Sequence, residues 1–204
     1  MTAVQDSADL FTLSVEAQNL LFREARTANT FTAEPVTDAQ IRAVYELIKL
    51  GPTAYNQQPL RIVLVRSAPA RERLLTHMSR GNQDKTQSAP LVAIMAEDLE
   101  FPRDLPTLFP HKPHVAGYFA ADADRDRSAR ISASLQIGYF LLGVRALGLA
   151  AGPMSGFDPE GLDADFFPDG TRRSLVVVNI GQPGPDAWGE RLPRHDYETV
   201  VTTV

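Results

Sequence analysis

Hydrophobic residues recur along the chain at spacings that predict its helices and strands. Spacings of three and four residues predict helices at 14–25, 37–50, 70–77, 128–147 and 159–167. Short apolar runs predict buried strands at 61–66, 90–96 and 174–181, with the last in the centre of a sheet. The chain of 204 residues is long enough for one domain with a sizeable core and short for two, so we expect a single domain over 1–204.

The second predicted helix has complete start and stop signals. Thr37 and Gln40 fit a capping box, and Val36 with Ile41 fits a hydrophobic staple. The glycine and proline at 51–52 end the helix. We therefore expect a rigid helix that holds the following loop in a fixed place.

That following loop, residues 51–59, is rich in amide and hydroxyl groups and is called the polar loop below. Pro52 and Pro59 restrict its backbone. Stiff polar loops between regular elements are common ligand sites. Taken alone, the polar loop is better interpreted as an ordinary connection, and only the other polar stretches of the chain favour a site.

Three further polar stretches allow both a binding and a structural interpretation. Residues 26–30, the phosphate segment below, offer one cation and short donors suited to a phosphate, or form a surface turn. A polar break is predicted at 81–85. In the binding interpretation its Asn82 and Lys85 contact the edge of a heterocycle, and in the structural interpretation both are solvated side chains. A glycine-bounded loop predicted at 152–158 lets backbone N–H groups approach a flat ligand, or is a plain connection.

The helix at 128–147 is apolar on almost all sides, so we expect a core helix that also meets a partner subunit. Before it, residues 99–127, the aromatic segment below, form an irregular stretch rich in proline and aromatic residues, which predicts a packed lid or binding loop. His111 and His114 are spaced like metal ligands. Pro113 prevents a regular helix from presenting both, so we expect no metal site.

Composition and charge narrow the class of protein. The net charge of -5 argues against a nucleic-acid or anionic-membrane surface, and the absence of cysteine excludes disulfides and thiol catalysis. Residues 1–13 carry two aspartates and no basic residue, unlike a signal peptide. The apolar stretch 131–144 is too short to span a bilayer. We expect a soluble, cytoplasmic protein with an extended C-terminal arm at 182–204.

Taken together, these stretches resemble the FMN-dependent nitroreductase family along nearly the whole chain. The resemblance is carried by residues 21–29, 51–59, 81–82 with 85–86, 108–111, 145–158 and 191–194. Within the family, 146–149 with Gly152-Pro153-Met154-Ser155-Gly156-Phe157-Asp158 is most similar to the malonic semialdehyde reductases of pyrimidine degradation.

The resemblance implies an α+β fold, with helices around a mixed, mostly antiparallel sheet, in an intertwined homodimer. It implies FMN at the dimer interface and NADH or NADPH as the reductant, with hydride relayed through flavin N5. The implied reaction converts malonic semialdehyde (3-oxopropanoate) to 3-hydroxypropanoate. The alternatives are a broad-specificity nitroreductase, quinone reductase or enone reductase, and a non-catalytic FMN-binding module.

The resemblance also implies roles for individual residues. Four are expected at the FMN phosphate: Arg26, Thr27, Asn29 and Arg191. Asn82 and Lys85 are expected at the polar edge of the flavin ring, the backbone of Ser155 and Gly156 near N5, and Pro153 as a further cofactor contact. Four are expected to reach the flavin from the partner subunit: Pro52, Thr53, Ala54 and Asn56. Five are candidate substrate contacts: His111, Lys112, His114, Tyr118 and Phe119.

Three positions depart from the family pattern. Many family members carry a basic residue at the position of Asn29, and some carry one at the position of Gly189. The expected phosphate site of this chain is therefore less cationic. Ser155 stands where some relatives have an acidic residue. The surroundings of flavin N5 are therefore less negative, which suits an anionic substrate.

Overall fold

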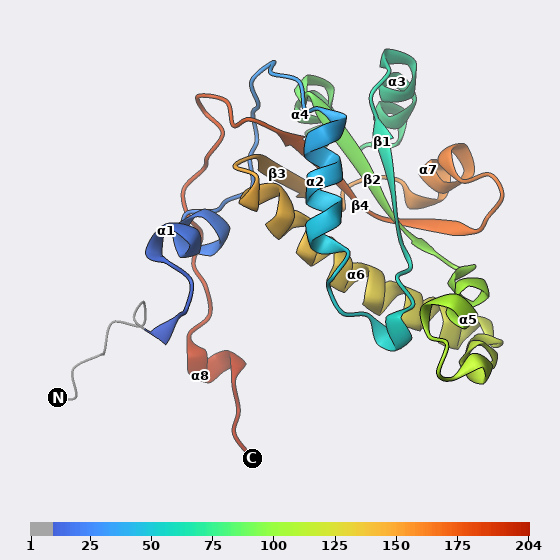
Figure 1. Cartoon of the computed structure of the whole chain (residues 1–204). Helices are drawn as coiled ribbons and strands as arrows, with labels where there is room; N and C mark the ends of the chain where they lie inside the picture. Colours follow the sequence, from blue (N-terminus) through green and yellow to red (C-terminus); the bar gives the residue numbers. More distant parts are fainter. Residues whose placement is uncertain (1–9) are drawn as a thin grey trace.

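The computed structural model describes residues 10–204, so most of the segment 1–13 lies outside the described residues. A four-stranded sheet organises the domain (Figure 1). Its strands are β1 (Leu60–Val65), β2 (Leu91–Asp98), β3 (Ala150–Met154) and β4 (Arg172–Gly181), in the order β1-β2-β4-β3. Both strands beside β4 run opposite to it, and β1 runs opposite to β2. Among the described residues the sheet is therefore wholly antiparallel, where a mixed, mostly antiparallel sheet was expected.

Helices cover both faces of this sheet. One face carries α2 (Asp38–Ile48) and α6 (Asp122–Ala146), and the other carries α3 (Ala68–His77) and α7 (Pro159–Phe166) (Figure 1). The other helical segments are α1 (Val15–Gln18), the π-helix η2 (Asn19–Arg23), η3 (Ala54–Asn56), α4 (Arg80–Ser88), η4 (Phe101–Asp104), α5 (Leu105–Leu108), η5 (Pro113–Phe119) and α8 (Tyr197–Val200). The α+β architecture of the sequence prediction is confirmed.

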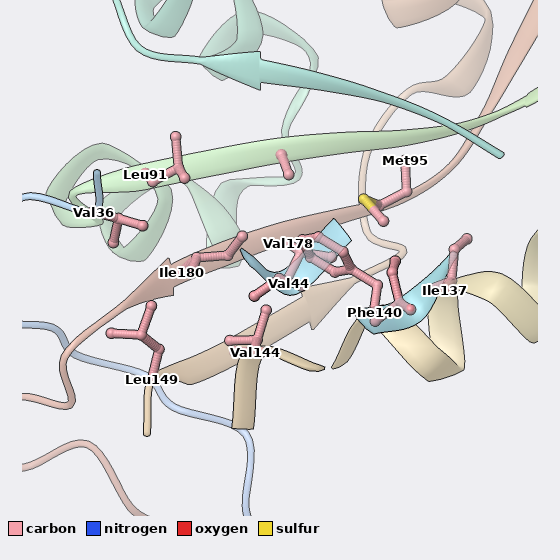
Figure 2. Close-up of a cluster of buried hydrophobic side chains, with 13 residues drawn as sticks. Val36, Val44, Leu91, Met95, Ile137, Phe140, Val144, Leu149, Val178 and Ile180 are labelled. Atoms are coloured by element: carbon pink, nitrogen blue, oxygen red, sulfur yellow. The ribbon is translucent and has the colours of Figure 1, made fainter. Parts of the chain in front are cut away.

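The central strand β2 is buried on both faces, and its side chains alternate between two cores. Leu91 and Met95 point toward α2 and α6, where they meet Val44, Phe140 and Val144 (Figure 2). The alternate residues of β2 belong to the second core, with α3 and α7. This period of two follows from the pleat of the strand. Each fully buried side chain of this size stabilises the fold by about 1.5–3 kcal/mol.

The helix α2 forms where its start and stop signals predicted. Thr37 accepts a hydrogen bond from the Gln40 N–H, and the Gln40 side chain accepts one from the Thr37 N–H, which completes the capping box. Val44 and Ile48 are buried, whereas Tyr45 is exposed.

Five sequence predictions are corrected. The polar break expected at 81–85 is inside helix α4, because Arg71 of α3 holds its end through the carbonyls of Thr86 (2.6 Å) and Ala89 (2.8 Å). The loop expected at 152–158 begins only after Met154, because β3 pairs with β4 that far.

The aromatic segment is not structureless, since η4, α5 and η5 fold around their own apolar cluster. The long helix α6 begins at Asp122, six residues before the expected start. The C-terminal arm is mostly extended but includes the short helix α8.

Candidate functional site

The phosphate segment lies against the free edge of β3. The Ala28 N–H donates to the carbonyl of Ala151 (3.4 Å), and a Cβ atom at Gly152 would lie 2.8 Å from the Ala28 carbonyl oxygen. Only glycine at 152 allows so close an approach of two backbones. The local sequence therefore fixes the phosphate segment along one side of the sheet.

The arm brings Arg191 to this segment. Arg26 donates from Nη1 to the Gly189 carbonyl (2.9 Å), and Arg191 donates to the carbonyls of Arg23 and Ala25. Thr27 and Asn29 are exposed beside them. The four residues expected at a phosphate thus come together from both ends of the chain.

A second group of expected site residues meets at the far end of β3. Asn82 of α4 donates from Nδ2 to the Gly156 carbonyl (2.9 Å), and the Ser79 N–H donates to the same oxygen (3.0 Å). A Cβ atom at Gly156 would lie 2.6 Å from Asn82 Nδ2, so a larger residue there would displace the Asn82 amide. Lys85 lies one turn further along α4 and is partly exposed, and Ser155 is exposed.

These two groups lie along one edge. From Ala151 to Gly156 the chain advances by about 17 Å if it stays extended. Asn179, opposite Gly152 on β4, ties α4 to this edge by donating to the Lys85 carbonyl (3.1 Å). The edge can therefore hold an elongated ligand, with an anionic group near Arg26 and a polar ring near Asn82. Ser79 and Asn179 were missed by the sequence reasoning, which treated each polar stretch separately.

The polar loop lies elsewhere in the same chain. The Gln57 side chain, 1% exposed, donates to the hydroxyls of Ser128 and Ser132, and the Ala54 N–H also donates to Ser132 (3.4 Å). Arg145, which lies near the phosphate segment, is about 20 Å further along α6. Figure 1 shows the polar loop, between α2 and β1, near α5 and remote from α1. One chain alone does not bring the polar loop to the β3 edge.

The polar loop has an unusual backbone. Tyr55, Asn56 and Gln58 have φ angles of 50°, 52° and 44°, in the left-handed region that residues other than glycine seldom adopt. Such conformations cluster at ligand-binding sites and persist where the surroundings fix them. Here the surroundings include the buried Gln57 network and a bond from Asn56 Nδ2 to the Leu108 carbonyl (2.9 Å).

The aromatic segment packs on the polar loop through Tyr55. Its ring lies edge-on to Phe109, Tyr118 and Phe119, with centroids 5.6, 6.3 and 6.1 Å away. Phe119 is only 7% exposed, so it can support a site from beneath but not line it. The other four candidate substrate contacts are exposed: His111, Lys112, His114 and Tyr118.

Within residues 10–204, no three His, Asp or Glu side chains gather in a way that could hold a metal ion. No helix in the same range is long and apolar enough to cross a membrane.

A comparison with known families assigns the chain. A model described as "Nitroreductase family" matches residues 22–181, most of the chain. The chain belongs to the nitroreductase family. A Streptomyces coelicolor relative with the provisional name NADH dehydrogenase/NAD(P)H nitroreductase is 58% identical over 193 residues, which cover 94% of this chain and 98% of the relative.

Solved structures of other nitroreductases share the fold. A Bacillus subtilis protein, provisionally named the nitroreductase ydfN, superposes with a TM-score of 0.84 at 22% identity, over 93% of this chain and 99% of its own. An Exiguobacterium sibiricum protein, provisionally named a nitroreductase and solved in complex with FMN, superposes with a TM-score of 0.83 at 16% identity, over 95% and 99%.

Proposed function

We propose that this nitroreductase is an FMN-dependent NAD(P)H oxidoreductase. The observation that carries the proposal is the β3 edge, which gathers Arg26 and Arg191 at one end and Asn82, Lys85 and Gly156 at the other. The provisional name of the Streptomyces relative and the FMN complex of the Exiguobacterium protein support the same assignment.

The residues present suit FMN. Guanidinium groups and the Thr27 hydroxyl match a phosphate monoester, which is anionic at neutral pH. Asn82 and Lys85 offer an amide and a cation to the polar edge of the ring, and the close packing around Gly156 leaves backbone rather than side chain beside it. When bound, FMN supplies hydride transfer through its N5 position. The protein orients the ring and places positive charge at its edge.

We further propose a homodimer in which Pro52, Thr53, Ala54 and Asn56 reach the flavin of the partner subunit. The remoteness of the polar loop from the β3 edge of its own chain supports this arrangement. The outer face of α6 supports it too, because Ile131, Leu135 and Tyr139, spaced by four residues, are 53%, 50% and 41% exposed.

For the substrate we propose 3-oxopropanoate, reduced to 3-hydroxypropanoate when its aldehyde carbon gains a hydride and its oxygen a proton. The His111 ring packs on Phe109 and the His114 ring on Tyr118, and the exposed Lys112 between them in the chain offers positive charge to the carboxylate. A broad nitroreductase, quinone reductase or enone reductase is the second candidate, since Tyr55, Phe109 and Tyr118 also provide aromatic edges for a flat neutral substrate.

The first test is the visible spectrum of the purified protein before and after anaerobic NADH or NADPH. A yellow protein bleached by one of them supports the oxidoreductase, and a yellow protein bleached by neither supports a module that only binds FMN. A protein that stays colourless after FMN is added and the excess removed contradicts the proposal.

The second test separates the substrates. We expect Lys112→Ala to raise KM for 3-oxopropanoate by about tenfold, the effect of one charged contact, and to leave KM for a neutral quinone unchanged. Equal effects on both substrates would favour the broad-specificity enzyme.

A further inference from the structure

A hollow beside the phosphate segment carries charge that the site described so far does not use. Its volume is about 410 Å³, and it lies where the end of α6 meets η2 and the arm. Arg26 lines it together with Arg145, Trp188 and Glu24. The π-helix η2 contributes Asn19 and Leu20 to its wall. Isolated π-helical turns are rare and are frequent at functional sites.

Arg145 is the notable cation of this hollow. Its side chain is half-buried and donates from Nη1 to the Leu21 carbonyl (3.0 Å). It makes no ion pair with any carboxylate in residues 10–204, although Glu24 lines the same hollow. Burial lowers the pKa of Arg145, with no opposing charge to restore it. A half-buried cation without a counter-charge is costly unless a ligand supplies the anion.

The residues already assigned to the FMN phosphate do not exclude a further cation beside it. A phosphate monoester carries about -1.5 to -2 charges near neutral pH. Positions 29 and 189 are Asn and Gly, so they add no charge, and Gly189 instead accepts a hydrogen bond from Arg26. Arg26 and Arg145 share the wall of one hollow, and the Leu21 carbonyl already orients the Arg145 guanidinium.

We propose that Arg145 is a further ligand of the FMN phosphate, which enters the hollow between Arg145 and Arg26. The proposal rests on the proposed function, and it assigns to the end of α6 a binding role that the sequence interpretation gave only to the phosphate segment and the arm. Arg145 supplies a cation at a fixed position, whereas Arg191 lies on the exposed arm.

The test compares FMN with riboflavin, which has the same ring and no phosphate. The full chain, freed of bound flavin, is titrated with each ligand and flavin fluorescence is followed. Arg145→Gln keeps a polar side chain but loses the charge. We expect it to raise Kd for FMN by about tenfold to a hundredfold and to leave Kd for riboflavin unchanged. Arg145→Lys should recover part of the loss.

Two matched variants complete the test. Arg127→Gln removes an exposed arginine from the other half of the same helix and should change neither Kd. Glu24→Gln removes an acidic side chain from the wall of the hollow, which would repel a phosphate, and should lower Kd for FMN alone, a result that does not depend on the folding of an Arg145 variant.

An unchanged Kd for FMN in Arg145→Gln, or equal losses for FMN and riboflavin, would overturn the role of Arg145 while leaving the proposed function intact. A wild-type chain that binds riboflavin as tightly as FMN would also overturn it. A wild-type chain that binds neither flavin would contradict the proposed function itself, and this inference with it.

Discussion

The polar loop and the arm are both expected to contact the same cofactor, but the protein holds them in opposite ways. The polar loop is fixed by a buried amide on two serine hydroxyls and by a strained backbone. Backbone bonds such as Asn29 N–H to the Ala187 carbonyl (3.0 Å) hold the start of the arm, but its outer part, residues 189–204, is exposed and is joined to residues 23–26 only by arginine-to-carbonyl bonds at the surface. Buried hydrogen bonds are costly to break, whereas exposed ones compete with water.

The difference between the fixed polar loop and the exposed arm fits two different roles in binding. A loop that reaches into a partner subunit must keep its shape without support from its own site, so its conformation is set in advance. An arm that closes over a phosphate must admit the ligand first, so its contacts are weak enough to open. Four substitutions test this contrast.

The largest effect is expected for Gln57→Leu. Leucine fills similar space but leaves the Ser128 and Ser132 hydroxyls without their partner, so we expect the free energy of unfolding to fall by about 3 kcal/mol. Denaturant unfolding measures this loss. Gln87→Leu, on an exposed side chain, is the control and should stay within about 0.5 kcal/mol of wild type. A loss below about 1 kcal/mol for Gln57→Leu would mean that the buried amide does not fix the loop.

The next effect is expected for Gly152→Ala. The added methyl would meet the Ala28 carbonyl oxygen at 2.8 Å, and neither backbone can move freely. We expect a loss of about 1–2 kcal/mol and faster hydrogen exchange in the phosphate segment. Gly117→Ala, where no atom lies within 4 Å, should have no such effect. Unchanged hydrogen exchange in the phosphate segment would show that its contact with β3 tolerates a side chain at position 152.

Asn56→Ala should cost about 1 kcal/mol, because it removes the bond to the Leu108 carbonyl and places alanine at φ 52°. Asn56→Gly loses the same bond but tolerates the angle, so it should cost less. Equal losses for the two variants would show that the backbone conformation contributes no strain.

The smallest effect on stability is expected for Arg191→Gln. Its bonds are exposed, so the free energy of unfolding should change by less than about 0.5 kcal/mol. Hydrogen exchange in the arm should nevertheless become faster. A loss above about 1 kcal/mol would remove the contrast, since the arm would then be as firmly held as the polar loop.

Local signals allowed the sequence to predict much of the fold. The capping box of α2 and the apolar surface of α6 lie within single elements, so they can be recognised without knowing the rest of the chain. The helix α4 was missed because its composition is polar, and its end is held by Arg71 from another helix. The strand β3 was read as a loop because Gly152 and Pro153 are rare in strands, and only pairing with β4 makes it one.

For the site, the residues were predicted but not their grouping. The resemblance named Arg26, Asn82 and Gly156, yet nothing local shows that they share the β3 edge. The strain at Tyr55 and Asn56 was also not predictable, because it is imposed by contacts with α6 and the aromatic segment. Arg145 lay in a stretch that carries the resemblance but was given no site role, since its half-buried state depends on η2 folding beside it.

The position of the phosphate segment on β3 also bears on solubility. A free sheet edge presents unpaired backbone groups and can recruit strands of other chains. Ala28 occupies the Ala151 carbonyl of this edge, and Pro153 has no N–H to offer. The segment expected to hold the cofactor therefore also shields the sheet against aggregation. A substitution that detaches the phosphate segment from β3 would therefore cause both self-association of the protein and weaker binding of the cofactor.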